Sequence, residues 1–589
     1  MRHPLARWSA LGLAYLLVAL VLSWPLVLHL QDGLLGTPTM DQVDTAWLRL
    51  AAARWLTGQD PGIFAPLGYP LAAVVPNWVD HLLGAPLALL LPWPLADNLF
   101  WLLLFTANGL AGHALGRQVG GSHAAGLLCG LGFALCEPVL REINASHAPQ
   151  ALVLWSPLFL AALLRCASED GRLRDGALAG LFLALSAATY WYQGLFLAVL
   201  AAPLLLHALL GALRGGGLAP LAQRLGIASA LVLLVCGPLL AVSLVSAPEL
   251  AGVGGQALQH VPGMRGLPVP AEHAWTFLHG RGPEWLWQAQ PIATASRLSP
   301  VLLLAAIVGG LRAPSPRWPW VLAALLGGLL LMGPFLQWDG QVVQAAGHLV
   351  PLPGYLLAEL SDLFARLHWP LRWGIVVPLA LLPLAVRVPR PAFWGAALLV
   401  ETMLLSGNAP LQVSPVDAFA GWGALRGSPG PVLVLPQERD ADGPSTMGLI
   451  YRASGASLAN ELGVPPRAAQ PLAFRRWHER LALRSLWREL RSVGSSDAYP
   501  SSAMAQLEAE GIAAVALDVT PGGALHPDES AKLARELEAM LGEPVDYGAA
   551  LVWWLHEPPR PPPAMPGAQA WRVERHEALV AAGAQRGRR

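Results

Sequence analysis

The chain has 589 residues, of which 54% are hydrophobic and only 13% are charged, and its formal net charge is zero. Soluble domains carry roughly 25% charged residues, so this composition excludes an ordinary soluble protein and predicts a membrane protein. Basic and acidic residues are equal in number, and no block of like charge indicates a nucleic-acid partner or a polybasic lipid tether. The four cysteines show no metal-binding spacing and are expected to be small buried hydrophobes.

Apolar runs close to the ~20 residues that cross a bilayer recur through the first four hundred positions. The first run follows Arg2 and Arg7 and lacks a small-residue cleavage site, so we predict a retained helix rather than a signal peptide. Hydropathy predicts eleven transmembrane helices, at about 9–30, 96–117, 122–137, 149–166, 175–190, 192–213, 225–247, 298–312, 318–336, 370–386 and 391–407.

Arginine predicts which side each connection faces. With the N-terminus in the cytoplasm, every short inward connection carries arginine: Arg117; Arg165, Arg172 and Arg174; Arg214 and Arg224; Arg312 and Arg317; Arg387 and Arg390. The positive-inside bias then places the long connections 31–95, 248–297 and 337–369 outside. An odd number of spans also exports everything after residue 407.

The exported part is more polar and is predicted to be a separate α/β domain, residues 408–560, outside the cytoplasm. Segments 431–436, 512–519 and 549–557 have the pattern of strands, and 475–493 and 529–541 have helical periodicity. Residues 561–589 are rich in Pro and Arg and are expected to be a flexible tail. The exported part contains no catalytic motif that we recognise.

The first outward loop, 31–95, is long, and loops of that length are often functional. A helix that begins at Asp44 would be amphipathic, and the apolar piece 79–93 is short and flanked by proline, so we expect both to lie on the outer bilayer surface. The helix pattern places Trp47, Leu48 and Trp55 at the membrane interface, and Arg49 and Arg54 in solvent.

Several short motifs together suggest a family. They are Asp41 with Trp47 six residues later, Gly58, Pro66 and Gly68 in FAPLGYP, Asn98 in ADNLFWLLLF, His147 and Gln150 in SHAPQALVLWSPL, Tyr190 in ATYWYQGLF, the stretch LHWPLRWG, and VLVLP in the exported part. In this layout the chain resembles bacterial multi-pass membrane glycosyltransferases of the type C (GT-C) superfamily, especially the branch with a soluble C-terminal domain. The likeness covers nearly the whole chain, although each motif is short.

This resemblance implies a polytopic α-helical membrane bundle, residues 1–407, followed by an extracytoplasmic α/β domain. It also implies an inverting hexosyl- or pentosyltransferase in the bacterial cytoplasmic (inner) membrane. The donor would be a polyprenyl-phosphate sugar in the membrane lipid, and the acceptor a hydroxyl of an envelope glycan, lipid or protein. The leaving phosphate is stable as an anion, so the main requirement is a carboxylate that deprotonates the acceptor.

By its position in the family pattern, Asp41 is the candidate general base. Asp44, one helical turn later, could orient the acceptor or hold a cation, or it could simply cap the surface helix. Arg372 in LHWPLRWG is the candidate for binding the donor phosphate, because its guanidinium offers a forked set of donors. Its alternative role is an interfacial anchor, and Arg366 is a weaker candidate for the phosphate.

The second outward loop carries Arg141, Glu142 and His147, and a polar cluster between two spans is a candidate substrate site. Glu142 and His147 are therefore candidate substrate-binding residues, together with Gln150, Tyr190 and Asn77. Some superfamily members use a divalent cation. The spacing of the acidic residues and His147 is not diagnostic of metal ligands, so no cofactor is assigned and a metal stays open.

Two alternatives to an enzyme are open. The first is a non-catalytic relative whose C-terminal domain binds envelope components, since fold likeness alone does not establish activity. Better-understood branches carry adjacent acidic residues in the first loop and an Asp in the next outer loop, where this chain has Glu142 and His147. The second is a transporter, which would need ionisable residues deep in the spans. Apart from Glu401 the central spans are nearly free of charge, which counts against ion-coupled transport.

Overall fold

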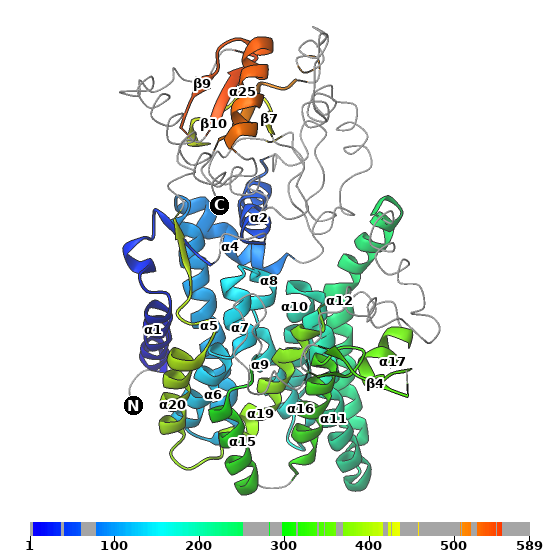
Figure 1. Cartoon of the computed structure of the whole chain (residues 1–589). Coiled ribbons are helices and arrows are strands. Elements are labelled where there is room, and N and C mark those ends of the chain that lie inside the picture. The colour runs from blue at the N-terminus through cyan, green and yellow to red at the C-terminus, as the bar shows by residue number, and fades with distance from the viewer. Residues whose placement is uncertain are drawn as a thin grey trace.

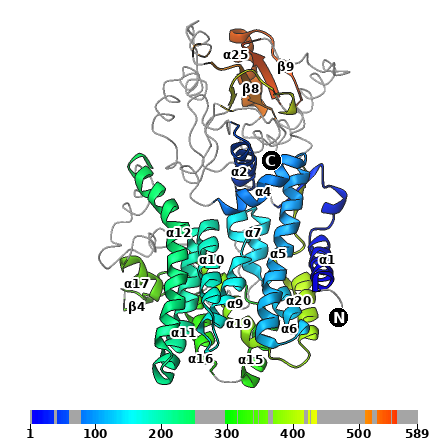
Figure 2. The ribbon, with the colours of Figure 1, turned by 180° about the vertical axis from the view of Figure 1, so that it is seen from behind.

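The computed structural model describes residues 4–36, 41–59, 78–250, 282, 297–313, 316–338, 341–346, 348–360, 369–415, 422–425, 427–435, 458, 507, 509, 511–519, 527–548 and 550–556. The described chain is mostly helical as far as residue 405, and the helices form one bundle (Figures 1 and 2). The elements of its first part are α1 (Pro4–Leu22), η1 (Leu26–Leu28), β1 (Gly33–Leu35), α2 (Asp41–Leu56), α4 (Val79–Leu90), α5 (Leu95–Gly120), α6 (His123–Ala134), α7 (Glu137–Asn144), α8 (Ala148–Ala151), α9 (Trp155–Ala167), α10 (Leu173–Thr189), α11 (Trp191–Gly215) and α12 (Leu218–Leu250).

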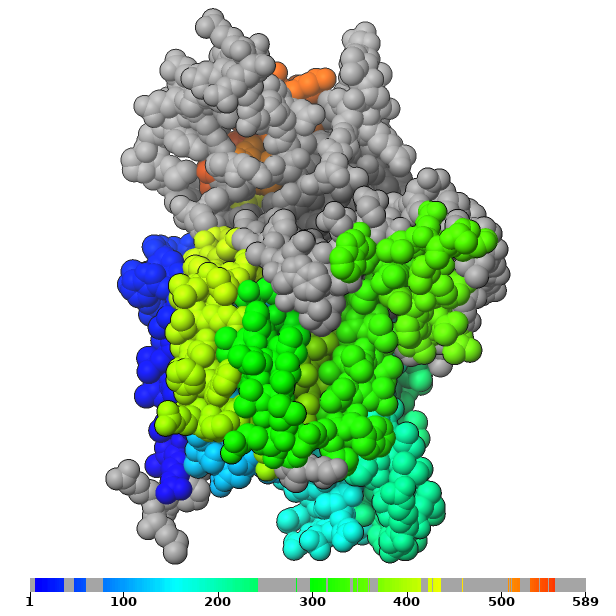
Figure 3. Space-filling model, turned by 60° about the horizontal axis from the view of Figure 1, so that its bottom comes forward, coloured from blue at the N-terminus to red at the C-terminus, as the bar shows by residue number. Residues whose placement is uncertain are grey.

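The second part of the bundle follows residue 297. Its helices are α15 (Pro300–Arg312), α16 (Trp318–Leu331), α17 (Pro353–Leu360), η4 (Pro370–Ile375), α19 (Val376–Ala385) and α20 (Pro391–Leu405). Two short antiparallel pairs lie between α16 and α17, formed by β2 (Gln337–Trp338) with β3 (Gln341–Val342) and by β4 (Gln344–Ala345) with β5 (His348–Leu349). On one face of the bundle α15 and α20 lie side by side (Figure 3).

Each of the eleven segments predicted as a span contains a helix. Among the described residues, four helices are long and apolar enough to cross a membrane, namely 95–120, 148–167, 191–215 and 218–241. A fifth span results if α6 and α7, which are bent by 46° relative to each other, are counted as one. The number of helices that cross the membrane therefore remains a prediction.

Glycines set the close packing of α5 and α6 at the centre of the bundle. Gly121, with a φ of 73°, ends α5, and the Ser122 hydroxyl accepts a hydrogen bond from the Ala125 amide at 3.1 Å to begin α6. A Cβ on Gly112 would lie 3.0 Å from the Cα of Gly130 on the facing helix. Small residues of this kind let the two backbones approach closely, as in helix pairs within membranes.

A two-stranded ribbon joins the two ends of the bundle sequence. β1 pairs antiparallel with β6 (Val413–Pro415), which follows α20. Asn98, at the start of α5, fixes β1: its Oδ1 accepts from the Leu35 amide at 3.1 Å, and its Nδ2 donates to the Gly33 carbonyl at 2.8 Å. This ribbon therefore brings the beginning of the first outward loop against the segment that leads to the C-terminal strands.

The C-terminal strands form a mixed sheet in the order β7-β8-β10-β9. Its elements are β7 (Val432–Leu435), β8 (Ala514–Asp518), α25 (Pro527–Leu541), β9 (Val545–Asp546) and β10 (Ala550–Trp554). β7 and β8 are parallel, and β10 is antiparallel to both of its neighbours. Strands and a helix thus form where the sequence predicts them. The predicted helix 475–493 and the tail 561–589 lie outside the described residues, and the domain boundary at 408 stays a prediction.

Helix α2 packs differently from the prediction. Trp47 is fully buried and Leu48 is 4% exposed, and both belong to the core of the C-terminal sheet together with Trp422. Arg49, predicted in solvent, is 2% exposed because it pairs with Asp97 of α5 at 2.9 Å. The prediction of an interfacial face was wrong for Trp47 and Leu48, because a distant part of the chain covers that face (Figure 1). The prediction of a position in solvent was wrong for Arg49, because Arg49 pairs with the buried Asp97.

Candidate functional site

A pocket lies where α7, α8, the start of α11 and η4 meet. The polar side chains that line it are Arg141, Glu142, Gln150, Tyr190, Gln193 and Arg372. Four of these, Glu142, Gln150, Tyr190 and Arg372, are candidate site residues from the sequence. Residues from distant parts of the chain, predicted one by one, therefore line one pocket.

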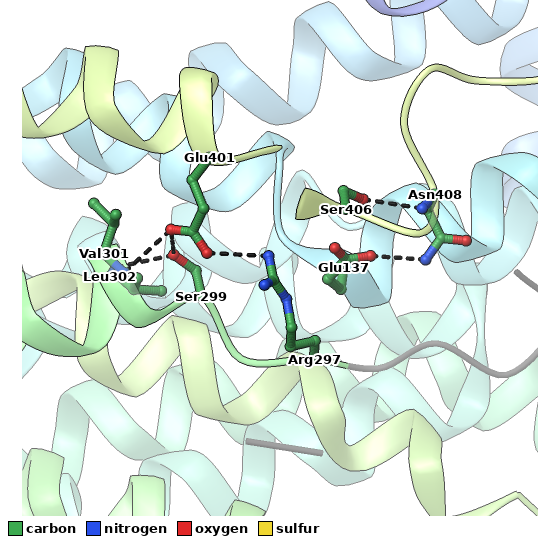
Figure 4. A network of polar contacts seen from close by, with 8 residues as sticks. All are labelled: Glu137, Arg297, Ser299, Val301, Leu302, Glu401, Ser406 and Asn408. Carbon is green, nitrogen blue, oxygen red and sulfur yellow. Dashed lines mark hydrogen bonds and ion pairs between the residues drawn. The ribbon is translucent and has the colours of Figure 1, made fainter. Parts of the chain in front are cut away.

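Helix α7 presents Arg141 and Glu142, and it is held at both ends. Pro138 occupies its first turn, where a missing amide hydrogen costs nothing, and so favours a new helix just after α6 ends. At its start Glu137 accepts a hydrogen bond from Asn408 Nδ2 at 2.7 Å (Figure 4). At its end Asn144 Nδ2 donates to the Asn408 carbonyl at 2.9 Å. We call residues 406–412, which follow α20, the clamp segment, because they fix the position of α7.

Glu401 holds a second junction beside the clamp segment. It accepts hydrogen bonds from Arg297 Nη2 at 3.1 Å, from the Ser299 hydroxyl at 2.6 Å and from the Val301 amide at 3.1 Å (Figure 4). It is 7% exposed, so it does not reach water, and it ties α20 to the start of α15. A second pocket, beside Glu137, Arg297 and Glu401, is lined by these groups, but both carboxylates already have partners within the chain.

The charges of the first pocket are tightly paired on one side. Arg141 donates to one oxygen of Glu142, and the His147 Nδ1 contacts the other oxygen. Burial alone would raise the pKa of Glu142, but the charges of Arg141, His147 and Arg372 hold it well below its ordinary value. Glu142 is therefore ionised at neutral pH, and it orients Arg141.

Arg372 occupies the opposite wall. Its Nη1 donates to the Tyr190 hydroxyl at 2.6 Å, and its guanidinium lies 5.5 Å from the centre of the Tyr190 ring. The neighbouring Trp373 is 2% exposed, and its ring is tilted by 51° against that of Phe196 with 4.5 Å between ring centres, so Trp373 is a core residue rather than an anchor in the bilayer interface. With two guanidinium groups and one carboxylate, the lining carries one net positive charge and favours an anion.

Two of the groups that line the pocket were given no role from the sequence: Arg141 was named only as a member of the polar cluster with Glu142 and His147, and Gln193 was not named. Arg141 Nη1 is buried and has no hydrogen-bond partner among the residues that the structure describes. Gln193 was missed. It lies in the first turn of α11 and in the same stretch ATYWYQGLF as Tyr190, so its place in that stretch was the available signal.

The remaining candidates are placed only in part. His147 contacts Glu142 at the edge of the pocket, with its side chain 18% exposed. Asp41 is the first residue of α2, but its side chain and that of Asp44 lie outside the described part of the structure, as do Asn77 and Arg366 altogether. Among the described residues, no three His, Cys, Asp or Glu side chains gather as metal ligands.

Comparison with known proteins finds similar solved structures at low identity. No family model matches the chain, and no curated protein matches it. A variant of the arabinofuranosyltransferase AftD from Mycobacteria is 16% identical with a TM-score of 0.41, and the alignment covers 87% of this chain but 37% of AftD. Two structures of ArnT from Cupriavidus metallidurans are also similar, the apo state at 14% identity and the complex with undecaprenyl phosphate at 13%. Each has a TM-score of 0.38, and each alignment covers 94% of this chain and 98% of ArnT.

The chain thus spans little more than a third of the length of AftD. At TM-scores of 0.38 to 0.41 the alignments assign no role to any residue of the pocket.

Proposed function

We propose that the chain is an inverting membrane glycosyltransferase. It transfers a hexosyl or pentosyl unit from a polyprenyl-phosphate donor to a hydroxyl of an envelope glycan, lipid or protein, at the outer face of the bacterial cytoplasmic membrane. The observation that carries this proposal is the pocket in which Arg141 and Arg372 lie with Glu142, Gln150 and Tyr190.

The charge of the pocket suits the donor. A sugar joined to a lipid through phosphate is a phosphodiester with a single negative charge, and the lining carries one positive charge in excess. Arginine presents its donors as a fork that matches phosphate oxygens. The buried Nη1 of Arg141, without a partner among the described residues, would gain a charge-assisted hydrogen bond from a phosphate oxygen.

Asp41 is the proposed general base. Gly36 donates its amide to the Gln412 carbonyl at 2.8 Å, and the adjacent Leu35 carbonyl accepts from the Ser146 hydroxyl at 3.4 Å, next to His147. Five residue steps separate Gly36 from Asp41, which limits their Cα separation to roughly 18 Å. The chain therefore keeps Asp41 within reach of the outward end where the second outer loop lies.

The test is transfer of label from a panel of undecaprenyl-phosphate sugars by purified protein in lipid. Undecaprenyl phosphate is the ligand named for one of the similar structures, and it provides the first lipid carrier to use. Asp41→Asn should lower the rate of transfer about 10²- to 10⁴-fold, the usual contribution of a general base. Asp32→Asn is the matched control, because Asp32 lies in the same outward loop with its side chain 62% exposed.

Two results would count against the proposal. A wild-type protein that neither transfers sugar from any donor in the panel nor hydrolyses one would contradict the function. Residues 408–589 would then be the part to test for envelope binding. An Asp41→Asn variant as active as the wild type would contradict only the assignment of the base.

A further inference from the structure

Gln193 has a fixed orientation within the pocket. It is 3% exposed, and its Nε2 donates to the Pro149 carbonyl at 2.8 Å and to the Leu152 carbonyl at 3.4 Å. Because both contacts are to carbonyl oxygens, they require the nitrogen of the amide at this position, and the amide oxygen must point the other way. That oxygen, Oε1, is buried and has no hydrogen-bond partner among the described residues.

Gln150 offers a second acceptor of the same kind. Its Oε1 is likewise buried without a partner in the part of the chain that the structure describes, and the residue lines the same pocket. Its side chain also bonds to that of Tyr190. The bonds from Gln193 to the carbonyls of Pro149 and Leu152 tie α11 to the turn that carries Gln150, so the two acceptors are held in a fixed relation.

Buried polar groups in proteins almost always have partners, so two acceptors that line one pocket without a partner in the described chain pair with a hydrogen-bond donor there, water in the free protein or a ligand that displaces it. A phosphate diester has only acceptor oxygens at neutral pH, so it would not satisfy the two amide oxygens. The guanidinium groups of Arg141 and Arg372 are suited to the phosphate instead. The ring hydroxyls of a sugar are donors, and they match the amide oxygens.

We propose that Gln150 and Gln193 each accept a hydrogen bond from a hydroxyl of the donor sugar, and that they select the sugar while Arg141 and Arg372 hold the phosphate. This inference rests on the proposed function and adds to it the residues that determine specificity. A site built to pair with a substrate hydroxyl discriminates strongly against an analogue that lacks it, because a buried acceptor is then left without a partner.

The experiment compares two kinds of probe on the same variants. Gln193→Met and Gln150→Met keep the approximate volume and remove the amide. Dissociation constants are measured in lipid for undecaprenyl phosphate, which has no sugar, and for undecaprenyl-phosphate hexoses and pentoses with their single deoxy and amino analogues. Each substitution should weaken the preferred sugar donor about 10-fold, the scale of one hydrogen bond with a buried group, and leave undecaprenyl phosphate within about 2-fold.

A matched control and a double-mutant cycle separate this effect from a change of fold. Gln118→Met removes an amide whose groups are both bonded within the chain, Nε2 to the Ala161 carbonyl at 2.8 Å and Oε1 to Arg165 at 3.0 Å, and it should change neither constant. The wild type should bind one deoxy donor about 10-fold more weakly than the parent sugar. The variant that has lost the matching acceptor should not distinguish them.

The outcomes distinguish this inference from the proposed function. If the wild type binds neither undecaprenyl phosphate nor any sugar donor, both fail. The sugar-selecting role is wrong, while the proposed function stands, in either of two cases. In the first, the wild type binds but the glutamine substitutions weaken the binding of undecaprenyl phosphate as much as that of the sugar donors. In the second, the wild type binds every deoxy donor as tightly as the parent sugar donor. A response confined to an amino sugar would overturn the assignment to hydroxyls.

Discussion

Two clusters of buried charge in this protein differ in their access to a ligand. We call the first the sealed cluster, formed where α2, α4 and α5 meet by Arg49, Asp80, His81 and Asp97. We call the second the pocket cluster, formed by Arg141, Glu142, His147 and Arg372. Every side chain of the sealed cluster is at most 4% exposed, whereas His147 is 18% exposed and Arg372 is half-buried at the pocket wall. Buried charge alone therefore does not indicate a binding site.

The two clusters also differ in net charge. In the sealed cluster Arg49 pairs with Asp97, and burial raises the pKa of Asp80 to about 7 despite the charge of Arg49. Burial, together with Arg49, lowers the pKa of His81 to about 3, so His81 is neutral. Its charges therefore nearly cancel, as expected for a cluster that holds helices together. The pocket cluster keeps an excess positive charge that an anionic ligand can neutralise.

The largest expected effect is on stability and comes from the sealed cluster. Arg49→Met removes the charged partner of Asp97 and should lower the free energy of unfolding by about 3–5 kcal/mol, measured by denaturant titration in detergent. The fraction that stays folded should bind undecaprenyl phosphate as the wild type does. The double variant Arg49→Met, Asp97→Leu should recover much of the loss, and a single variant as stable as the wild type would contradict the structural role.

The next effect is on binding and comes from the pocket cluster. Arg372→Met should weaken the binding of undecaprenyl phosphate about 10- to 100-fold, because a hydrogen bond with a charged group is worth roughly 1.5–3 kcal/mol. The unfolding midpoint should change little, because Arg372 is only half-buried. Arg387→Met, at an exposed arginine of an inward turn, is the matched control. If Arg372→Met lowers stability without weakening binding, Arg372 has a structural role like that of Arg49 in the sealed cluster, and it does not bind the phosphate.

A smaller effect comes from the clamp segment that supports the pocket cluster. Asn408→Ala removes the hydrogen bond to Glu137 but keeps the backbone carbonyl that accepts from Asn144. We expect a loss of about 1–3 kcal/mol in unfolding free energy, faster amide exchange in α7 and weaker binding of undecaprenyl phosphate. Asn408→Asp, which places a second carboxylate beside Glu137, should be worse than alanine. Unchanged exchange in α7 would show that the clamp segment does not position it.

The smallest effect is a pH dependence of the sealed cluster. The Asp80 carboxyl has a pKa of 3.8 when unperturbed and of about 7 in the folded chain, so the folded protein retains this proton between those values. The contribution of Asp80 to stability is therefore full below pH 3.8 and is lost as the pH rises through about 7. The Asp80→Asn side chain does not titrate. As the pH rises from 3.8 to about 7, the free energy of unfolding of the wild type should therefore fall by about 1 kcal/mol or more relative to that of Asp80→Asn.

Denaturant titrations of both proteins at several pH values measure this difference. Arg49, His81 and Asp97 surround Asp80 and are the same in both proteins, so the two proteins differ only in the carboxyl group at position 80. A difference in unfolding free energy that stays constant from pH 4 to pH 8 would contradict the raised pKa of Asp80.

Local patterns in the sequence were sufficient for much of the fold. Hydropathy located a helix in each of the eleven predicted segments, and short apolar runs rich in β-branched and aromatic residues located the strands β7, β8 and β10, because these signals depend on residues a few positions apart. The same patterns failed at α2. The apolar face of an amphipathic helix must be covered, and either a membrane or a protein core can cover it. The sequence pattern does not distinguish the two, so Trp47 was predicted at the membrane interface although it lies in the core of the C-terminal sheet.

For the site, sequence motifs identified Glu142, Gln150, Tyr190 and Arg372 one at a time, each from its own short stretch. Only the tertiary structure brought them to one pocket, paired Arg372 with Tyr190 and left the buried amide oxygens of Gln150 and Gln193 without partners among the described residues. The sequence by itself determined the membrane character, the helices and the type of side chain available for the chemistry. The contacts were decided by tertiary structure, because the pairing of residues distant in the chain depends on how the helices pack and not on any local period.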